Sequence, residues 1–134
     1  MPPSTESEPA PDSDPARFVT AFFESLTAAT VGGTPPEDVM ERHFTPDIVQ
    51  ISDGIRLDHD RLLAHLRPVR RNVTAYRFEV HEALAQGTHI AARLTVHART
   101  RQGGATTTDV HLFADFTDDG RMRRAHQLTR AVSR

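Results

Sequence analysis

The chain has 134 residues, which suits one globular domain able to bury about 68% of the surface that its unfolded form would expose. Its formal net charge is −2 and its acidic and basic residues are mixed along the sequence, which argues against a nucleic-acid-binding surface because such surfaces carry a concentrated basic patch. Cysteine is absent and all basic residues apart from histidine are arginine, so disulfides, thiolate metal ligands and lysine Schiff bases are excluded.

Residues 1–14 are rich in Pro, Ser and acidic side chains and lack an apolar run. We therefore expect a solvated, disordered N-terminal tail, followed by a single domain over residues 15–134. The tail does not resemble a secretory signal, and no later segment is long and apolar enough to cross a membrane. These features favour a cytoplasmic protein without a membrane partner.

Three helices are predicted in the first half of the domain. Asp14-Pro15 supplies an N-cap and a first-turn proline, and Gly32-Gly33 ends that helix. The sequence from Thr34 to Glu37 has the spacing of a capping box and predicts a second, short helix. Asp58 is the expected cap of a third helix, which Pro68 terminates or kinks. Apolar or core-facing side chains recur at helical spacing at Phe18, Val19, Phe22, Phe23, Leu26, Val39, Met40, His43, Phe44, Leu62, Leu63 and Leu66.

Strands are predicted from residue 48 onward. Residues 48–52 read as a short strand that ends at the turn Asp53-Gly54. Three long runs then alternate apolar and polar residues at period two, as antiparallel strands covered on one side do. A last strand is expected over residues 122–132. The apolar positions of the long runs are Tyr76, Phe78, Val80 and Leu84, then Ile90, Ala92, Leu94 and Val96, then Val110, Leu112, Ala114 and Phe116.

The parity of the long runs constrains their connections. If Leu84 and Ile90 both face inward, the loop between them has an odd number of residues. A three-residue hairpin loop over residues 86–88, with Gly87 at positive φ, satisfies this condition.

This order of elements resembles the nuclear transport factor 2-like superfamily, in particular its SnoaL-like group, from about residue 16 to residue 132. The best local matches are residues 44–49, 86–91 and 116–122. The resemblance implies an α+β fold, a cone-shaped α+β barrel in which three N-terminal helices pack on a curved, mainly antiparallel sheet around a pocket. The group includes polyketide cyclases, isomerases, epoxide hydrolases, dehydratases and non-catalytic ligand binders, so the fold alone does not name the activity.

Steroid isomerases of the superfamily use an Asp base together with a Tyr and a protonated Asp as oxyanion donors. The corresponding positions here hold Ser52, then Phe22 or Phe23, and a residue near Leu112. This departure argues against steroid-type isomerisation unless Asp53 takes the role of the base.

The first choice for a catalytic side chain is His126, because imidazole titrates near neutrality. The apolar residues Met122 and Leu128 share its parity and favour an inward orientation for this set. Alignment to the isomerases favours the opposite parity, with Ala125, Gln127 and Thr129 inward. Both orientations stay open at this stage.

Asp53 is the reserve base, since burial raises a carboxyl pKa; the alternative is a plain turn residue. Glu82 is the one acid on the apolar face of its run, where it either lies at the rim or pairs with an Arg or His. The expected substrate-binding side chains are Gln50, Ser52, Tyr76, Phe22, Leu112 and Arg124.

Polar residues are expected on the outer sheet face, with His97 opposite Asp109 and Thr95 opposite His111. The resemblance favours a homodimer through this face, over a solvent face or a metal site. Residues on it are His81, His97, His111, Arg77, Arg93 and Asp109.

Two functions follow. The first is a cofactor-free, metal-free SnoaL-like enzyme that performs cyclisation, isomerisation, dehydration or hydrolysis on a hydrophobic small molecule. The second is a ligand-binding or dimerisation module of the same fold without turnover.

Overall fold

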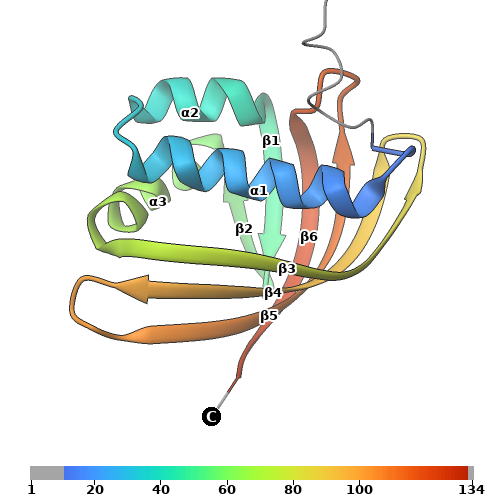
Figure 1. Ribbon diagram of the computed structural model, residues 1–134. Helices are drawn as coiled ribbons and strands as arrows, with labels where there is room; N and C mark the ends of the chain where they lie inside the picture. The colour runs from blue at the N-terminus through green and yellow to red at the C-terminus, as the bar shows by residue number, and fades with distance from the viewer. Residues whose placement is uncertain (1–10, 133–134) are drawn as a thin grey trace, which may run out of the picture.

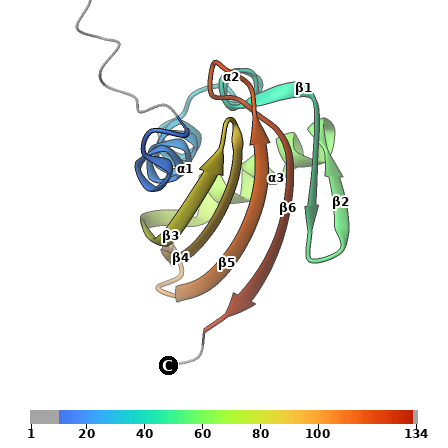
Figure 2. The same ribbon diagram turned by 90° about the vertical axis from the view of Figure 1, so that its right-hand side faces the viewer.

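A curved sheet holds three helices on its concave side, and the expected α+β class with its mainly antiparallel sheet is confirmed (Figures 1 and 2). The computed structural model describes residues 11–132, so most of the predicted tail lies outside the described residues. The elements are α1 (Pro15–Val31), α2 (Pro36–His43), β1 (Phe44–Ser52), β2 (Ile55–Asp58), α3 (His59–Asn72), β3 (Val73–Gln86), β4 (His89–Thr100), β5 (Ala105–Phe116) and β6 (Met122–Ala131).

The six strands lie in the order β2-β1-β6-β5-β4-β3, and only the β1–β6 pair is parallel among them. Strand β1 begins at Phe44, four residues before the prediction, and β2 was not predicted. Pro46 lies in the irregular stretch between the paired residues Phe44 and Val49. A proline is tolerated there because that stretch lacks the regular ladder in which its missing N–H would be needed.

The helix caps at Asp14 and Asp58 are confirmed. Their carboxylates accept hydrogen bonds from the backbone N–H groups of Arg17 and Arg61, at 3.2 and 3.0 Å. The capping box is wrong: α2 starts at Pro36, its N-cap is Pro35, and no side chain bonds to the cap. Helix α3 continues through Pro68 to Asn72, so this proline does not end it.

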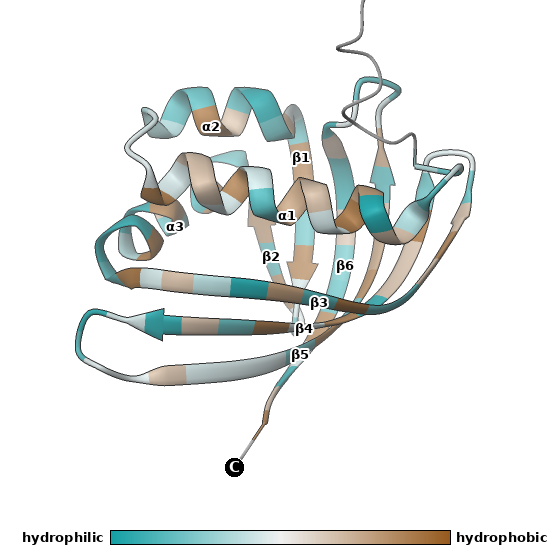
Figure 3. Ribbon diagram, in the orientation of Figure 1, coloured by the Kyte–Doolittle hydropathy of each residue, from teal (hydrophilic) through white to brown (hydrophobic). Residues whose placement is uncertain are grey.

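The core lies between the three helices and the concave sheet face. Brown and teal residues alternate along α1 and the long strands, as expected for elements covered on one side (Figure 3). Phe22 is central to it: its ring meets that of Phe116 edge to face at 5.2 Å and that of Phe44 at 6.0 Å. Phe18 contacts Phe116 in the same way at 4.8 Å. Such edge-to-face pairs add about 0.5–1.5 kcal/mol each beyond the buried area, which fixes α1 against β5.

A bulge in β3 corrects one prediction of parity. Val80 pairs with Leu94 but Glu82 pairs with Arg93, so His81 is an extra residue. An extra residue exchanges the two faces of the strand beyond it. Leu84 is therefore 67% exposed on the outer face. Glu82 also faces outward, where its carboxylate bonds the Arg93 guanidinium at 3.3 Å instead of lying at the pocket rim.

The hairpin after this bulge has two loop residues, Gly87 and Thr88, and not three. The prediction failed because Leu84 does not face inward. Gly87 has a φ of 60°, so the expected positive φ is confirmed.

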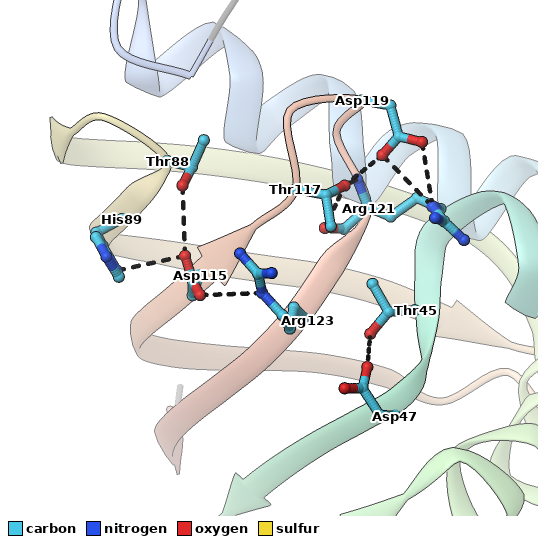
Figure 4. Close-up of polar contacts among 9 residues, drawn as sticks. All are labelled: Thr45, Asp47, Thr88, His89, Asp115, Thr117, Asp119, Arg121 and Arg123. Carbon is cyan, nitrogen blue, oxygen red and sulfur yellow. Dashed lines mark hydrogen bonds and ion pairs between the residues drawn. The ribbon is translucent and has the colours of Figure 1, made fainter.

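A second bulge, at Arg123 in β6, decides the orientation that the sequence left open. Met122 pairs with Phe116 and Arg124 with Asp115, so Arg123 is the extra residue. Its guanidinium donates to the Asp115 carboxylate at 3.2 Å (Figure 4). Beyond it, Ala125 is 3% exposed and faces the core.

The orientation inferred from apolar content is therefore wrong. His126, which pairs with the exposed Phe113, lies on the outer face together with Arg124 and Leu128. The three share the parity of Met122 in the sequence, but the bulge turns them to the opposite side.

Candidate functional site

A cavity of about 190 Å³ lies between α1, α3 and the concave sheet face. Its wall is mainly apolar, with a few polar side chains. We call it the cone pocket; it is lined by Phe22, Phe23, Leu26, Thr27, Thr30, Phe44, Gln50, Leu62, His65, Leu66, Val69, Met122 and Gln127. An apolar cavity of about 150 Å³ is enough to bind benzene, so this one suits a molecule of one or two rings.

Two amide side chains supply the polar part of the wall on the sheet side. Gln127 donates from Nε2 to the Ser52 hydroxyl at 2.9 Å, and the two residues are opposite each other in the β1–β6 pair. Gln50 lies two residues before Ser52 and so on the same face of β1. An amide offers both donors and acceptors, so this wall can bind a carbonyl or hydroxyl group of a ligand.

The helical side of the pocket contributes the imidazole of His65, an exposed residue of α3. None of the described residues that line the pocket is Asp or Glu. Thr30 is buried there, and its hydroxyl is engaged by the carbonyl of Leu26 at 2.7 Å. His65 is therefore the one lining side chain, within residues 11–132, that offers an imidazole, the commonest general acid or base.

Among the predicted substrate-binding residues, Phe22 and Gln50 line the pocket. Ser52 supports it through its bond to Gln127. Leu112 is 2% exposed in the core and is not part of the wall.

Asp53 is held at a turn outside the pocket wall, with a φ of 51°. Its carboxylate accepts hydrogen bonds from the Thr129 hydroxyl at 2.5 Å and from the Thr129 backbone N–H at 2.8 Å. These two bonds, the hydroxyl first, hold the pKa of Asp53 below its ordinary value. A general base near neutrality needs a raised carboxyl pKa, so this geometry suits a structural role that ties the β1–β2 turn to β6.

Tyr76, Arg124 and His126 lie away from the pocket. Tyr76 is beside Phe78, with ring centroids 5.9 Å apart, in a shallow groove that Arg77 and His97 also line. The bulge at Arg123 turns Arg124 and His126 outward.

The outer sheet face carries a chain of polar contacts. His81 Nε2 lies 2.7 Å from the Thr95 hydroxyl, which donates to Asp109 at 2.8 Å, and Arg130 donates to the same carboxylate at 3.1 Å. The bonds from Thr95 and then Arg130 lower the pKa of Asp109. The predicted register was wrong by two residues, because Asp109 is opposite Thr95 while His97 is opposite Thr107.

Sequence reasoning did not select Gln127 or His65 for the site. Gln127 could have been found by orienting the last strand from the alignment to the isomerases, which turns Gln127 inward, and not from its apolar content. His65 carried no signal, since a histidine on a helix most often faces solvent.

Within residues 11–132, no three His, Asp or Glu side chains form a group that could hold a metal ion. In the same part of the chain, no helix has both the length and the apolar character needed to span a bilayer.

The chain is similar to one protein family and to several solved structures. Residues 19–125 match the family model of the SnoaL-like domain. No curated protein matches the chain.

Three of the similar solved structures carry names that differ in the activity they give. A candidate isomerase from Rhodopseudomonas palustris has a TM-score of 0.69 and 14% identity, over 84% of this chain and 88% of that one. A candidate SnoaL-like polyketide cyclase from Shewanella denitrificans OS-217 has a TM-score of 0.64 and 11% identity, over 82% and 88%. An M. tuberculosis LEH-like epoxide hydrolase has a TM-score of 0.61 and 17% identity, over 87% and 86%. At these identities the likeness establishes the fold alone.

Proposed function

This chain belongs to the family of SnoaL-like domains, and we propose that its cone pocket binds a small, mainly apolar molecule and transfers a proton on it without a cofactor. The reaction class is cyclisation, isomerisation, dehydration or hydrolysis. The observation that carries the proposal is an apolar cavity with two amides on one wall and an imidazole on the other. Pockets with a few convergent polar groups are the usual sites of such chemistry.

Each polar group has a separate task in this proposal. The amide of Gln127, anchored on Ser52, donates to a carbonyl or hydroxyl oxygen of the ligand, with Gln50 beside it. The His65 imidazole takes up a proton from the ligand and returns it elsewhere. The phenyl and leucyl side chains exclude water, which strengthens the hydrogen bonds made inside.

The lack of a carboxyl group in the described wall favours a second candidate function, ligand binding without turnover. In that case His65 contributes only to the pocket entrance. Both candidates use the same cavity and differ in whether a proton moves.

Deuterium exchange separates the two candidates. The α-protons of β-tetralone, a two-ring ketone, exchange with D₂O, and proton NMR follows their loss with and without the protein. We expect faster exchange with the native protein, and His65→Gln should lose most of that acceleration, since one acid–base group contributes about 10²–10⁴-fold. Unaccelerated exchange despite saturable binding of the ketone would favour the binding module.

The outer sheet face supports a further part of the proposal, a homodimer. Leu84, Phe113 and Leu128 are 67%, 68% and 60% exposed there. Leu84 and Phe113 flank Ala91 in the strand register. Large apolar side chains gathered on one face, with charged residues around them, are typical of an interface.

Analytical ultracentrifugation tests the dimer. Phe113→Glu should shift the sedimentation coefficient from that of a dimer to that of a monomer. Ile55→Glu is the matched control, since Ile55 is 58% exposed on β2 beside Ser52, away from this face. A native protein that sediments as a monomer throughout would contradict the proposal.

A further inference from the structure

A second hollow, of about 340 Å³, lies on the other side of α1 from the cone pocket. It is bounded by α1, α2 and the turn between β5 and β6. Its lining side chains and backbone come from Phe18, Ala21, Phe22, Ser25, Arg42, His43, Asp119 and Gly120.

Ser25 and His43 meet in this hollow. The Ser25 hydroxyl oxygen lies 2.9 Å from Nε2 of the His43 ring. The other ring nitrogen, Nδ1, lies 2.8 Å from the carbonyl oxygen of Val39. Because a carbonyl only accepts hydrogen bonds, Nδ1 carries a proton. In the neutral ring Nε2 is then the acceptor, and the Ser25 hydroxyl donates to it.

The position of the imidazole is fixed by its surroundings. His43 is the last residue of α2 and is 5% exposed. Its ring meets that of Phe22 edge to face, with centroids 5.8 Å apart. Ser25, by contrast, is exposed on α1. The hydroxyl is therefore open to a ligand while the base behind it is held still.

We propose that Ser25 is a nucleophile activated by His43 and that this hollow accepts esters or thioesters of small carboxylic acids. A nucleophile in hydrogen-bond reach of a base, which a third group orients, is the arrangement that activates serine. The floor formed by Phe18, Ala21 and Phe22 suits a short acyl chain. The guanidinium of Arg42 at the rim can stabilise negative charge on the carbonyl oxygen.

The reaction proceeds in two steps. The Ser25 oxygen bonds to the acyl carbon while its proton passes to Nε2 of His43, and the tetrahedral adduct then expels an alcohol or thiol that receives this proton. In the second step, water loses a proton to Nε2 and its oxygen attacks the acyl-serine. Release of the carboxylic acid returns the proton to Ser25, so no oxidant or other co-reactant is consumed.

This site is separate from the proposed proton transfer in the cone pocket. Phe22 belongs to both walls, but Ser25 and His43 line only the second hollow. The competing explanation for the hydrogen bond is a structural link between α1 and α2. A structural link predicts no chemical reactivity at Ser25, and this difference defines the experiment.

The experiment is acetylation by p-nitrophenyl acetate, followed by release of p-nitrophenol and by mass spectrometry of peptides. We expect one acetyl group on Ser25 of the native protein, with a burst of p-nitrophenol. Ser25→Ala should abolish the burst, and His43→Gln should slow it about 10²–10⁴-fold. Thr20→Ala is the matched control, because the Thr20 hydroxyl lies on the same helix but donates to the backbone carbonyl of Ala16 and not to a histidine.

Circular dichroism shows whether each variant is folded. If His43→Gln does not fold, labelling of the native protein alone decides, because Ser25 must react faster than the other hydroxyl groups of the chain. Acetylation that spares Ser25, or that proceeds at the same rate in folded His43→Gln, would leave the bond as a structural link and overturn the inference.

Discussion

Replacing Gln127 by leucine separates the polar from the apolar part of ligand binding in the cone pocket. The variant Gln127→Leu keeps a side chain of similar size on the inner face of β6 but removes the amide that donates to Ser52. A ligand with a carbonyl group should lose one hydrogen bond, and a hydrocarbon of the same shape should lose none.

The magnitude follows from the worth of one neutral hydrogen bond, about 0.5–1.5 kcal/mol. This range corresponds to a roughly 2- to 12-fold increase in Kd for β-tetralone. The hydrocarbon tetralin should bind with an unchanged or slightly lower Kd, since leucine adds apolar surface to the wall.

Both constants can be measured by isothermal titration calorimetry on the native protein and the variant. Gln127→Leu should remain folded, because the polar group that it leaves behind, the Ser52 hydroxyl, is partly accessible. An equal loss of affinity for the two ligands, or no change in either affinity, would show that Gln127 makes no hydrogen bond to the ligand.

Three further predictions concern the scaffold. Met40→Ala should lower the free energy of unfolding in urea by about 2–5 kcal/mol, because Met40 is 0% exposed; a smaller loss would mean that the core collapses around the gap. Asp109→Asn should lower the melting temperature at neutral pH. Hydrogen bonds from Thr95 and then Arg130 lower the pKa of Asp109 in the folded protein below its ordinary value of 3.8. The stabilisation is therefore present above pH 3.8 and is lost as the pH falls below it, so the difference between the two melting temperatures should shrink in acid. A pH-independent difference would contradict that origin. Gly87→Ala should cost about 1 kcal/mol in the same urea assay, because its φ is 60°; a neutral outcome would show that the hairpin adapts.

The helices and the long strands could be predicted from the sequence, but β2 and the faces of β3 and β6 beyond their bulges could not. Proline, glycine and aspartate signals located the helices, and alternation located the long strands. The bulges at His81 and Arg123 shift the alternation by one residue, but the inward residues beyond them are small, such as Ala83 and Ala125, while the exposed Leu84 and Leu128 continue the upstream parity and hide the shift. Each bulge reverses every side chain beyond it, and this is why Leu84 and His126 were expected in the interior.

The candidate site could be predicted only in part, and one of its residues was missed because of a bulge. Gln50 lies in the part of β1 that pairs regularly, from Val49 to Ser52, and Phe22 lies on a regular helix; local periodicity therefore placed both correctly, and both line the pocket. Gln127 follows the bulge and was assigned to the wrong face by its apolar neighbours. His65 depended on how α3 lies against α1, a tertiary feature that helical periodicity does not contain.

Beyond its bulge, β6 turns Gln127 into the proposed ligand-binding cavity and His126 away from it. The chain has no cysteine, so Gln127→Cys and His126→Cys each carry a single thiol whose reaction with a maleimide reports its surroundings. Saturating β-tetralone should slow the reaction of the thiol at position 127 and leave that at position 126 unchanged. Protection of position 126 with none at 127 would contradict this orientation of β6.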